Sequence, residues 1–213
     1  AADAIHPSAG NPDASGKALD EDELRALTAL LREGEPEAGD YGERQCAMTA
    51  LDLIACTGMR LGEALALRVR DLRPQVPDVY VCGTVCERGG VFRQPTAKRG
   101  EDRRLAVPSR IVPTLRLMAA GKRPGDALLS PDGAIMRPAV VREALRDACA
   151  EAGIRRITPH ALRHTHATLA LQRGFTIADV QARLGHADVK TTLGIYGHTT
   201  AARDRGIAES FGG

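Results

Sequence analysis

The densest group of chemically active side chains lies in the segment ITPHALRHTHATLAL, residues 157–171. Thr158 and Pro159 indicate the start of a helix, because proline fits the first helical turn. His160 and Arg163 are three residues apart, so they share one face near the N-terminus of that helix. The free N–H groups and the positive end of the helix dipole attract an anion there. This pair therefore predicts a phosphate-binding site.

A metal site and a purely structural cluster are the alternatives for the same segment. His160 and His164 are four residues apart, a spacing that metal ligands use, and His166 is close by. However, no glutamate stands where the helix of a zinc protease carries its base, and no cysteine pair follows at ligand spacing. We therefore predict no metal and no cofactor, and we interpret His164 and His166 as structural residues.

Two further cations lie in distant segments of the chain. Arg60 stands at another predicted helix start, within TGMRLGEALALRVRDL, and Glu63 follows three residues later, where its carboxylate can orient the arginine. Lys98 lies within QPTAKRGEDRR, in a predicted turn between two strands, from which a long side chain can reach a substrate. Arg99 is adjacent, but an arginine does not release its proton near neutral pH, so Lys98 is the better proton donor.

A histidine and a tyrosine follow closer to the C-terminus. Gly185 is a predicted helix C-cap, and His186 comes directly after it in a turn. Tyr196 follows ten residues later, at the end of a helix predicted over 188–196. A free phenol has a pKa of ~10, so a nucleophilic tyrosine requires neighbouring cations or a base.

Together, TGMRLGEAL, HALRHTHAT, LGH and the tyrosine that follows resemble the tyrosine recombinases, the phage-integrase type of enzyme that breaks and rejoins DNA. The resemblance covers about residues 18–205. It implies metal-independent, site-specific recombination (integration or excision) through a 3′-phosphotyrosyl intermediate, on behalf of a mobile genetic element. By matching position, it implies six catalytic residues: Arg60, Lys98, His160, Arg163, His186 and Tyr196.

The chemistry of these side chains agrees with the roles that the resemblance implies. Cutting a phosphodiester without a metal requires a nucleophile, a proton donor and fixed positive charge around the phosphate oxygens. Arg60 and Arg163 offer guanidinium forks for those oxygens, and His186 can donate a further hydrogen bond. Lys98 can protonate the departing 5′-hydroxyl, and a histidine at position 160 can assist the attacking phenol.

The charge distribution also favours a nucleic acid partner. The net charge is only +2, but residues 1–43 carry three basic and eleven acidic side chains, so the remainder of the chain is strongly basic. Residues 93–123 alone carry nine basic and two acidic side chains. A basic body suggests a polyanion partner, with a solvated charged surface as the alternative. The chain has no Trp, three Tyr and three Phe, so few rings could stack on exposed bases, which argues against a single-strand reader.

The hydrophobic pattern predicts a mainly α-helical fold with a small antiparallel β-sheet insertion at 78–107, an α+β class similar to the catalytic domain of tyrosine recombinases. Asp20 and Glu23 predict a capping box at the start of the first helix. Strands are expected at 78–85, 90–94 and 103–107. Helices are expected at 20–33, 42–56, from residue 60 onward, and near 109–120, 138–152, 160–173, 176–184, 188–196 and 200–209.

The domain organisation follows from the same pattern. Residues 1–17 are expected to be a linker or a disordered N-terminus, and residues 18–213 one catalytic domain. The N-terminal DNA-clamping domain that the family usually carries is not expected within this chain.

Composition and resemblance together set the expected partners and location. No apolar run is long enough to cross a bilayer, the N-terminus does not resemble a secretory signal, and the five cysteines are scattered, so we expect a reduced, cytoplasmic, nucleoid-associated protein of a prokaryote. The expected partners are double-stranded DNA and further protomers in a tetrameric synapse, with a monomer when free. Ile207 and Phe211 give the C-terminal segment an apolar character that could bind a neighbouring protomer.

Type IB topoisomerase-like relaxation of DNA and a non-catalytic DNA-binding module remain as alternative functions.

Overall fold

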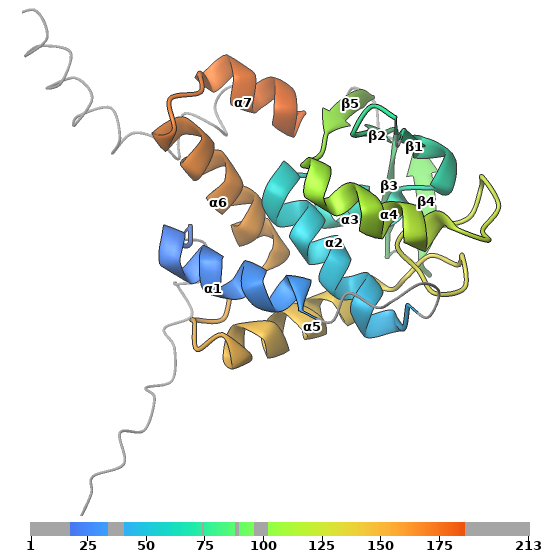
Figure 1. Ribbon diagram of the computed structural model, residues 1–213, viewed down its shortest axis with the longest axis horizontal. Helices are drawn as coiled ribbons and strands as arrows, with labels where there is room; N and C mark the ends of the chain where they lie inside the picture. The colour runs from blue at the N-terminus through green and yellow to red at the C-terminus, as the bar shows by residue number, and fades with distance from the viewer. Residues whose placement is uncertain (1–17, 34–40, 74, 88–89, 96–101, 186–213) are drawn as a thin grey trace, which may run out of the picture.

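Figure 1 shows the computed structural model of the protein, which describes residues 18–33, 41–73, 75–87, 90–95 and 102–185. The two small sheets lie at one end of the molecule, and α1, α5 and α6 gather at the other (Figure 1). The helices are α1 (Glu21–Arg32), α2 (Glu43–Thr57), α3 (Leu61–Ala66), α4 (Val112–Ala119), α5 (Pro138–Glu151), α6 (Pro159–Gln172), α7 (Ile177–Leu184) and the 3₁₀ helices η2 (Val69–Asp71) and η3 (Ser109–Ile111). The strands are β1 (Leu72–Arg73), β2 (Asp78–Val81), β3 (Gly83–Cys86), β4 (Phe92–Pro95) and β5 (Arg103–Ala106). The predicted fold class, mainly α with a small antiparallel β part, is confirmed.

Local capping signals fix the starts of α1 and α6. The Asp20 carboxylate accepts the Glu23 N–H at 2.8 Å, and the Glu23 carboxylate accepts the Asp20 N–H at 3.0 Å, so the predicted capping box is present. At the start of α6, the Thr158 hydroxyl accepts the Ala161 N–H at 3.3 Å, and the proline that follows is the first helical residue. Both helices therefore begin where their sequence signals place them.

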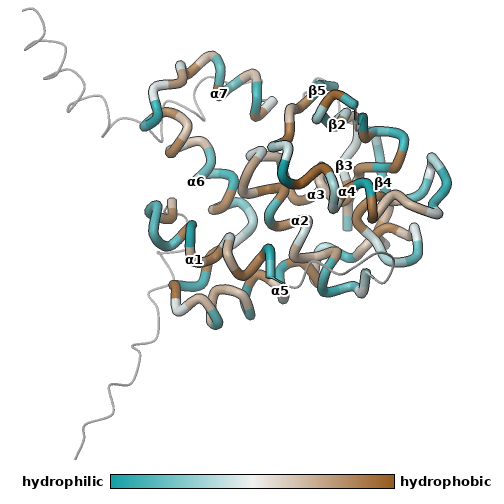
Figure 2. Tube along the Cα trace, viewed as in Figure 1, coloured by the Kyte–Doolittle hydropathy of each residue, from teal (hydrophilic) through white to brown (hydrophobic). Residues whose placement is uncertain are grey.

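The central helix α2 organises the core. Most of its residues are buried, and it packs against α1, α3, α5 and α6. In Figure 2 the hydrophobic colour is concentrated around α2, α3 and α4 in the middle of the molecule. The helix ends at Gly58, whose φ of 72° favours glycine. A Cβ atom there would lie 2.6 Å from Cδ2 of Leu184 and 2.7 Å from Cδ2 of His166, so only glycine permits this approach between α2, α6 and α7.

The β part differs from the prediction. The single strand predicted over 78–85 is wrong: β2 joins β1 and β5 in one antiparallel sheet, whereas β3 pairs with β4 in another. The chain changes sheets at Cys82 and Gly83. A Cβ atom on Gly83 would lie 2.5 Å from the guanidinium carbon of Arg93, and that guanidinium donates to the Ala66 carbonyl at 2.9 Å. Arg93 therefore crosses the backbone closely at Gly83, a long-range contact that the local pattern does not encode.

Several predicted segments lie outside the described residues, namely the linker at 1–17 and the helices at 188–196 and 200–209. Within the described part of the chain, no helix has both the length and the apolar character needed to span a membrane. All five cysteines belong to described segments, and all are free thiols.

Candidate active site

Arg60 and Glu63 form an ion pair at the start of α3. The Arg60 guanidinium donates from Nη1 to Oε1 of Glu63 at 2.9 Å, and its backbone N–H donates to Oε2 at 2.9 Å. The arginine side chain is 45% exposed, whereas the glutamate side chain is only 3% exposed. Glu63 therefore anchors an arginine that still faces solvent, as the spacing of the two residues predicts.

Arg103 of β5 binds the same carboxylate. Its Nη2 donates to Oε2 of Glu63 at 2.9 Å, and its Nη1 donates to Oε1 at 3.3 Å. Its Nε donates to the main-chain carbonyl of Arg183 in α7 at 3.0 Å. Burial alone would raise the pKa of Glu63, but the hydrogen bond and charge of Arg103, with those of Arg60, hold that pKa below its usual range. The carboxylate is therefore ionised at neutral pH and joins α3 to β5, and Arg103 links both to α7.

The sequence reasoning did not single out Arg103. A usable signal is the pair of adjacent arginines in β5, because successive side chains in a strand point to opposite faces. A strand packed on one face points one of the two inward, and a buried arginine requires acceptors such as a carboxylate or main-chain carbonyls. Its neighbour Arg104 is 45% exposed and lies 4.7 Å from the ring centre of Tyr80.

Arg163 of α6 is almost completely enclosed, with 3% of its surface exposed. It donates from Nη1 to the Gly58 carbonyl at 2.6 Å and from Nη2 to the Leu184 carbonyl at 2.9 Å. Burial, followed by the charge of Arg60, lowers its pKa to about 9. A guanidinium has five N–H groups and these two bonds use two of them, so further donors remain for an anion. Arg163, which is predicted to bind phosphate, thus also connects α6 to the ends of α2 and α7.

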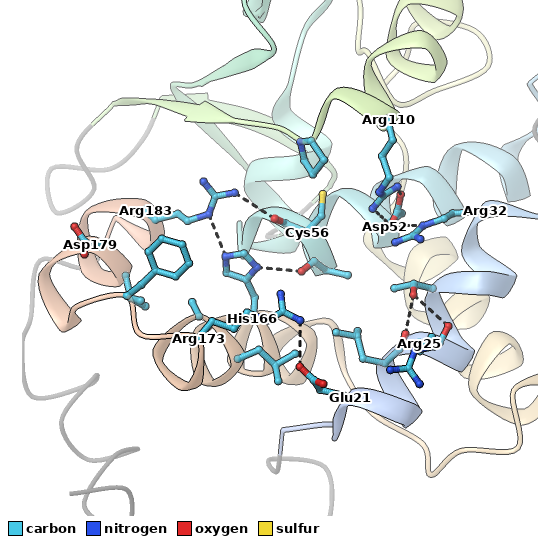
Figure 3. Close-up of a pocket in the computed structure, with 18 residues that line it drawn as sticks. Glu21, Arg25, Arg32, Asp52, Cys56, Arg110, His166, Arg173, Asp179 and Arg183 are labelled. Carbon is cyan, nitrogen blue, oxygen red and sulfur yellow. Dashed lines mark hydrogen bonds and ion pairs between the residues drawn. The ribbon is translucent and has the colours of Figure 1, made fainter. Parts of the chain in front are cut away.

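The histidines of α6 lie in three different environments. His160 is exposed, in contrast to the enclosed Arg163 one turn later on the same helix. His164 is partly buried, and burial together with His160 lowers its pKa. His166 is held on both sides: its Nδ1 donates to the Ala55 carbonyl at 3.1 Å, and its Nε2 accepts from Nε of Arg183 at 3.0 Å (Figure 3).

The bonds of His166 support its interpretation as a structural residue. Burial, with a smaller contribution from the charge of Arg183, lowers its pKa to about 4, so it is neutral at physiological pH. Among the described residues there is no group of three or more His, Cys, Asp or Glu side chains that could hold a metal ion.

The end of α7 lies directly against this charge network. Gly185 caps the helix with a φ of 64°, as predicted, and a Cβ atom on it would lie only 2.7 Å from Nη1 of Arg103. The Arg183 side chain reaches back to the carbonyls of Cys56 at 3.2 Å and Ala106 at 3.1 Å (Figure 3 shows the first of these). The chain therefore leaves the described region beside Arg103, at the residue before His186.

Three of the six predicted site residues, Lys98, His186 and Tyr196, lie outside the described residues. The described ends that flank Lys98 are β4 and β5, which belong to different sheets. β4 pairs with β3, and β5 pairs with β2. Among the described residues, the structure brings together Arg60 and Arg163 with Glu63 and Arg103.

Comparisons with known proteins identify the family of the chain. The sequence model of the phage integrase family matches residues 17–203. The chain is 30% identical over 185 residues to the integrase of Staphylococcus phage L54a, covering 79% of this chain and 52% of that protein. It is 33% identical over 196 residues to the tyrosine recombinase XerD of Caulobacter vibrioides, covering 90% of this chain and 60% of that protein. The chain thus spans about half of the length of the relatives it matches.

Solved structures show the same fold. The crystal structure of the XerA recombinase superposes with a TM-score of 0.66 at 28% identity, covering 90% of this chain and 64% of that one. The Tn1549 transposon integrase, solved in complex with transposon right end DNA, superposes with a TM-score of 0.74 at 18% identity and covers 92% and 66%.

Proposed function

Because the chain belongs to the phage integrase family, we propose that it carries the catalytic domain, over residues 18–213, of a site-specific tyrosine recombinase. In this proposal the protein integrates or excises a mobile element by cutting and rejoining double-stranded DNA, and it works at the nucleoid. The observation that carries the proposal is the buried network in which one carboxylate and two backbone carbonyls hold Arg60 and Arg163 at one site.

The two arginines are suited to a phosphate diester. Arg60 contributes to the lowered pKa of Arg163, so the two positive charges repel each other across a short distance. The charge of Glu63 offsets this repulsion only in part, and an anion between the guanidiniums would relieve it further. The two guanidiniums would stabilise a trigonal-bipyramidal phosphate, which carries additional negative charge, more than they stabilise the ground state. Such preferential stabilisation of the transition state is the condition for catalysis.

The remaining steps are assigned to the other predicted residues. The Tyr196 oxygen attacks phosphorus and forms an O–P bond while the bond to the 5′-oxygen breaks. Lys98 supplies the proton that the departing 5′-oxygen takes up, and His160 helps remove the phenol proton. His186 donates a hydrogen bond to a phosphate oxygen. Rejoining is the reverse reaction with the 5′-hydroxyl of another strand, and the phosphotyrosyl bond conserves the energy for it.

Covalent trapping tests this function. A duplex that the protein binds is first selected from a random-sequence library; it is called the selected duplex below. A nicked suicide version of the selected duplex is then incubated with the full chain. We expect a covalent adduct mapped to Tyr196, which Tyr196→Phe abolishes with DNA binding retained. An adduct on Tyr41 or Tyr80 would refute the assignment of the nucleophile.

Three further assays separate the alternative functions. Relaxation of a supercoiled plasmid that lacks the selected sequence would favour a type IB topoisomerase-like enzyme. Binding to the selected duplex without any adduct would favour a non-catalytic DNA-binding module. Strand exchange between two selected duplexes would support the recombinase.

We also propose that protomers assemble on DNA into a tetrameric synapse through residues 200–213, and that the free protein is a monomer. A pocket of about 560 Å³ lies between α1, α2, α6 and α7 (Figure 3), and Phe175 on its border is 58% exposed. Charged residues line part of the pocket, and its apolar side chains, those of Leu24, Leu169, Phe175 and Val180, suit Ile207 and Phe211 of a neighbouring protomer.

Deletion and substitution distinguish this contact from its alternatives. Removing residues 200–213 should weaken assembly on the selected duplex without lowering the free energy of unfolding, and Phe175→Ser should do the same. Normal assembly of both variants would contradict the proposal. A drop in stability on deletion would indicate that the segment binds its own protomer.

A further inference from the structure

Three segments that are distant in sequence meet at the side chain of Arg103. Its two terminal nitrogens bind both oxygens of Glu63, and its Nε binds the carbonyl of Arg183. The backbone of Gly185 lies against the same guanidinium, so closely that a Cβ atom would be 2.7 Å from Nη1. Only 10% of the side chain is exposed. Each of its three nitrogens therefore has a hydrogen-bond partner inside the protein.

We propose that Arg103 is a positioning residue for DNA cleavage: it sets the direction of the Arg60 guanidinium through Glu63 and holds the end of α7, from which the chain continues to His186. The inference rests on the proposed recombinase function and adds to it a residue outside the predicted catalytic set.

The hydrogen-bond pattern around Glu63 supports this role. Oε1 accepts from Arg60 Nη1 and Arg103 Nη1, while Oε2 accepts from the Arg60 backbone N–H and Arg103 Nη2. The two arginines thus share one carboxylate, and moving either guanidinium moves the acceptor of the other. Lysine cannot replace this fork, because an ammonium group offers one point of charge and not two parallel donors.

The contact with α7 supports the second half of the inference. The carbonyls in the last turn of a helix lack intrahelical partners and attract cations. Arg103 binds one of them, that of Arg183, and Arg163 binds the next, that of Leu184. Two arginines of the same network therefore hold two successive carbonyls at the end of α7. His186, which is predicted to donate a hydrogen bond to the phosphate, follows shortly after in the sequence.

Removing Arg103 should also change how Glu63 titrates. Burial is the largest effect on the pKa of Glu63 and raises it, and Arg103 is the main opposing group. The charged groups that face this carboxylate among the described residues are Arg60 from α3, Arg103 from β5 and Arg163 from α6. Without Arg103, part of Glu63 should become protonated nearer neutral pH, and the neutral acid would hold Arg60 less firmly. Cleavage should then depend on pH in a way that a purely structural defect would not produce.

The experiment measures single-turnover adduct formation by the full chain on the selected duplex across a pH series, with DNA affinity measured separately. Arg103→Gln should lower the rate by roughly 10- to 100-fold, the loss expected for a small misplacement of catalytic groups, with little change in affinity. Its rate should rise with pH over a range in which the wild-type rate is flat. Adding Glu63→Gln should restore the wild-type pH profile while the rate stays low.

Arg104→Gln is the matched control, because it removes the same charge from the adjacent, exposed position of β5. It should cleave at nearly the wild-type rate. If Arg103→Gln fails to fold, Arg103→Lys keeps the charge, and it should cleave slowly with a wild-type pH profile. A folded Arg103→Gln or Arg103→Lys variant with the wild-type rate would overturn the inference. Absence of any adduct with the wild-type chain would instead refute the proposed function.

Discussion

Arg163 donates a 2.9 Å hydrogen bond to the main-chain carbonyl of Leu184, so an arginine predicted to bind phosphate also holds the end of α7 in place. The same side chain donates to the carbonyl of Gly58 at the end of α2. A residue of this kind stabilises the fold and prepares the site at once. Arg60 is different, because its side chain is half exposed. Among the described residues its hydrogen-bond partner is Glu63, whose carboxylate also accepts hydrogen bonds from Arg103.

This difference predicts separate effects on stability for two substitutions that should both abolish cleavage. Arg163→Ala leaves two buried carbonyls without their donors and should lower the free energy of unfolding by about 2–4 kcal/mol. Arg60→Ala removes a partly exposed ion pair and should cost about 1 kcal/mol or less. Urea unfolding and adduct formation on the selected duplex measure the two properties. Equal losses of stability in both variants would contradict the prediction that Arg163 contributes more to the fold than Arg60 does.

Stability should depend on pH through His166, whose pKa is lowered from 6.5 to about 4 by burial and by Arg183. The unfolded chain binds a proton at the ordinary pKa, whereas the folded chain resists it. The free energy of unfolding should therefore fall as the pH drops from 6.5 towards 4, and this histidine should contribute no pH dependence above that window. His166→Gln, which can still bond on both sides, should show a smaller loss between about pH 7.5 and about pH 5 in urea unfolding. An identical loss in both proteins would show that His166 takes up no additional proton on unfolding.

Gly58 offers a test of the contact between α2, α6 and α7. Gly58→Ala places a methyl group within 2.7 Å of Leu184 and His166 in addition to straining a backbone with φ of 72°. Gly153→Ala is the control, because its φ of 66° is similar and nothing lies within 4 Å of its Cβ position. The control should lose about 1 kcal/mol of stability from backbone strain. Gly58→Ala should lose a further ~1–3 kcal/mol from overpacking, and cleavage should fall because α7 moves. Equal destabilisation of the two variants would show that the site relaxes without cost.

Cleavage should not require a divalent metal, because the arginines and the predicted lysine and histidines supply the positive charge that a metal ion supplies in nucleases. Adduct formation on the selected duplex is expected to persist in excess chelator. Far-UV circular dichroism in the same buffer checks that the protein stays folded. Loss of cleavage in chelator and its recovery with Mg²⁺ would refute metal independence.

Local chemistry in the sequence was sufficient for much of the helical part. The capping box of Asp20 and Glu23, the Thr158 cap of α6 and the left-handed Gly185 all depend on atoms within a few residues of each other. The pairing of Arg60 with Glu63 belongs to the same class, since one helical turn separates the two residues. Such features can be predicted because the helix geometry itself brings the partners together.

The tertiary structure alone decided how the distant charges share partners. The division of the predicted strand over 78–85 depends on β2 pairing with β5 while β3 pairs with β4. Burial of Arg163 and the fork of Arg103 on Glu63 depend on α6, α7 and β5 packing around the start of α3. The sequence shows that these arginines are present, but many carboxylates and carbonyls could accept from each of them. Which one does is determined by packing, because a buried guanidinium must be satisfied by whatever acceptors the neighbouring elements bring within reach.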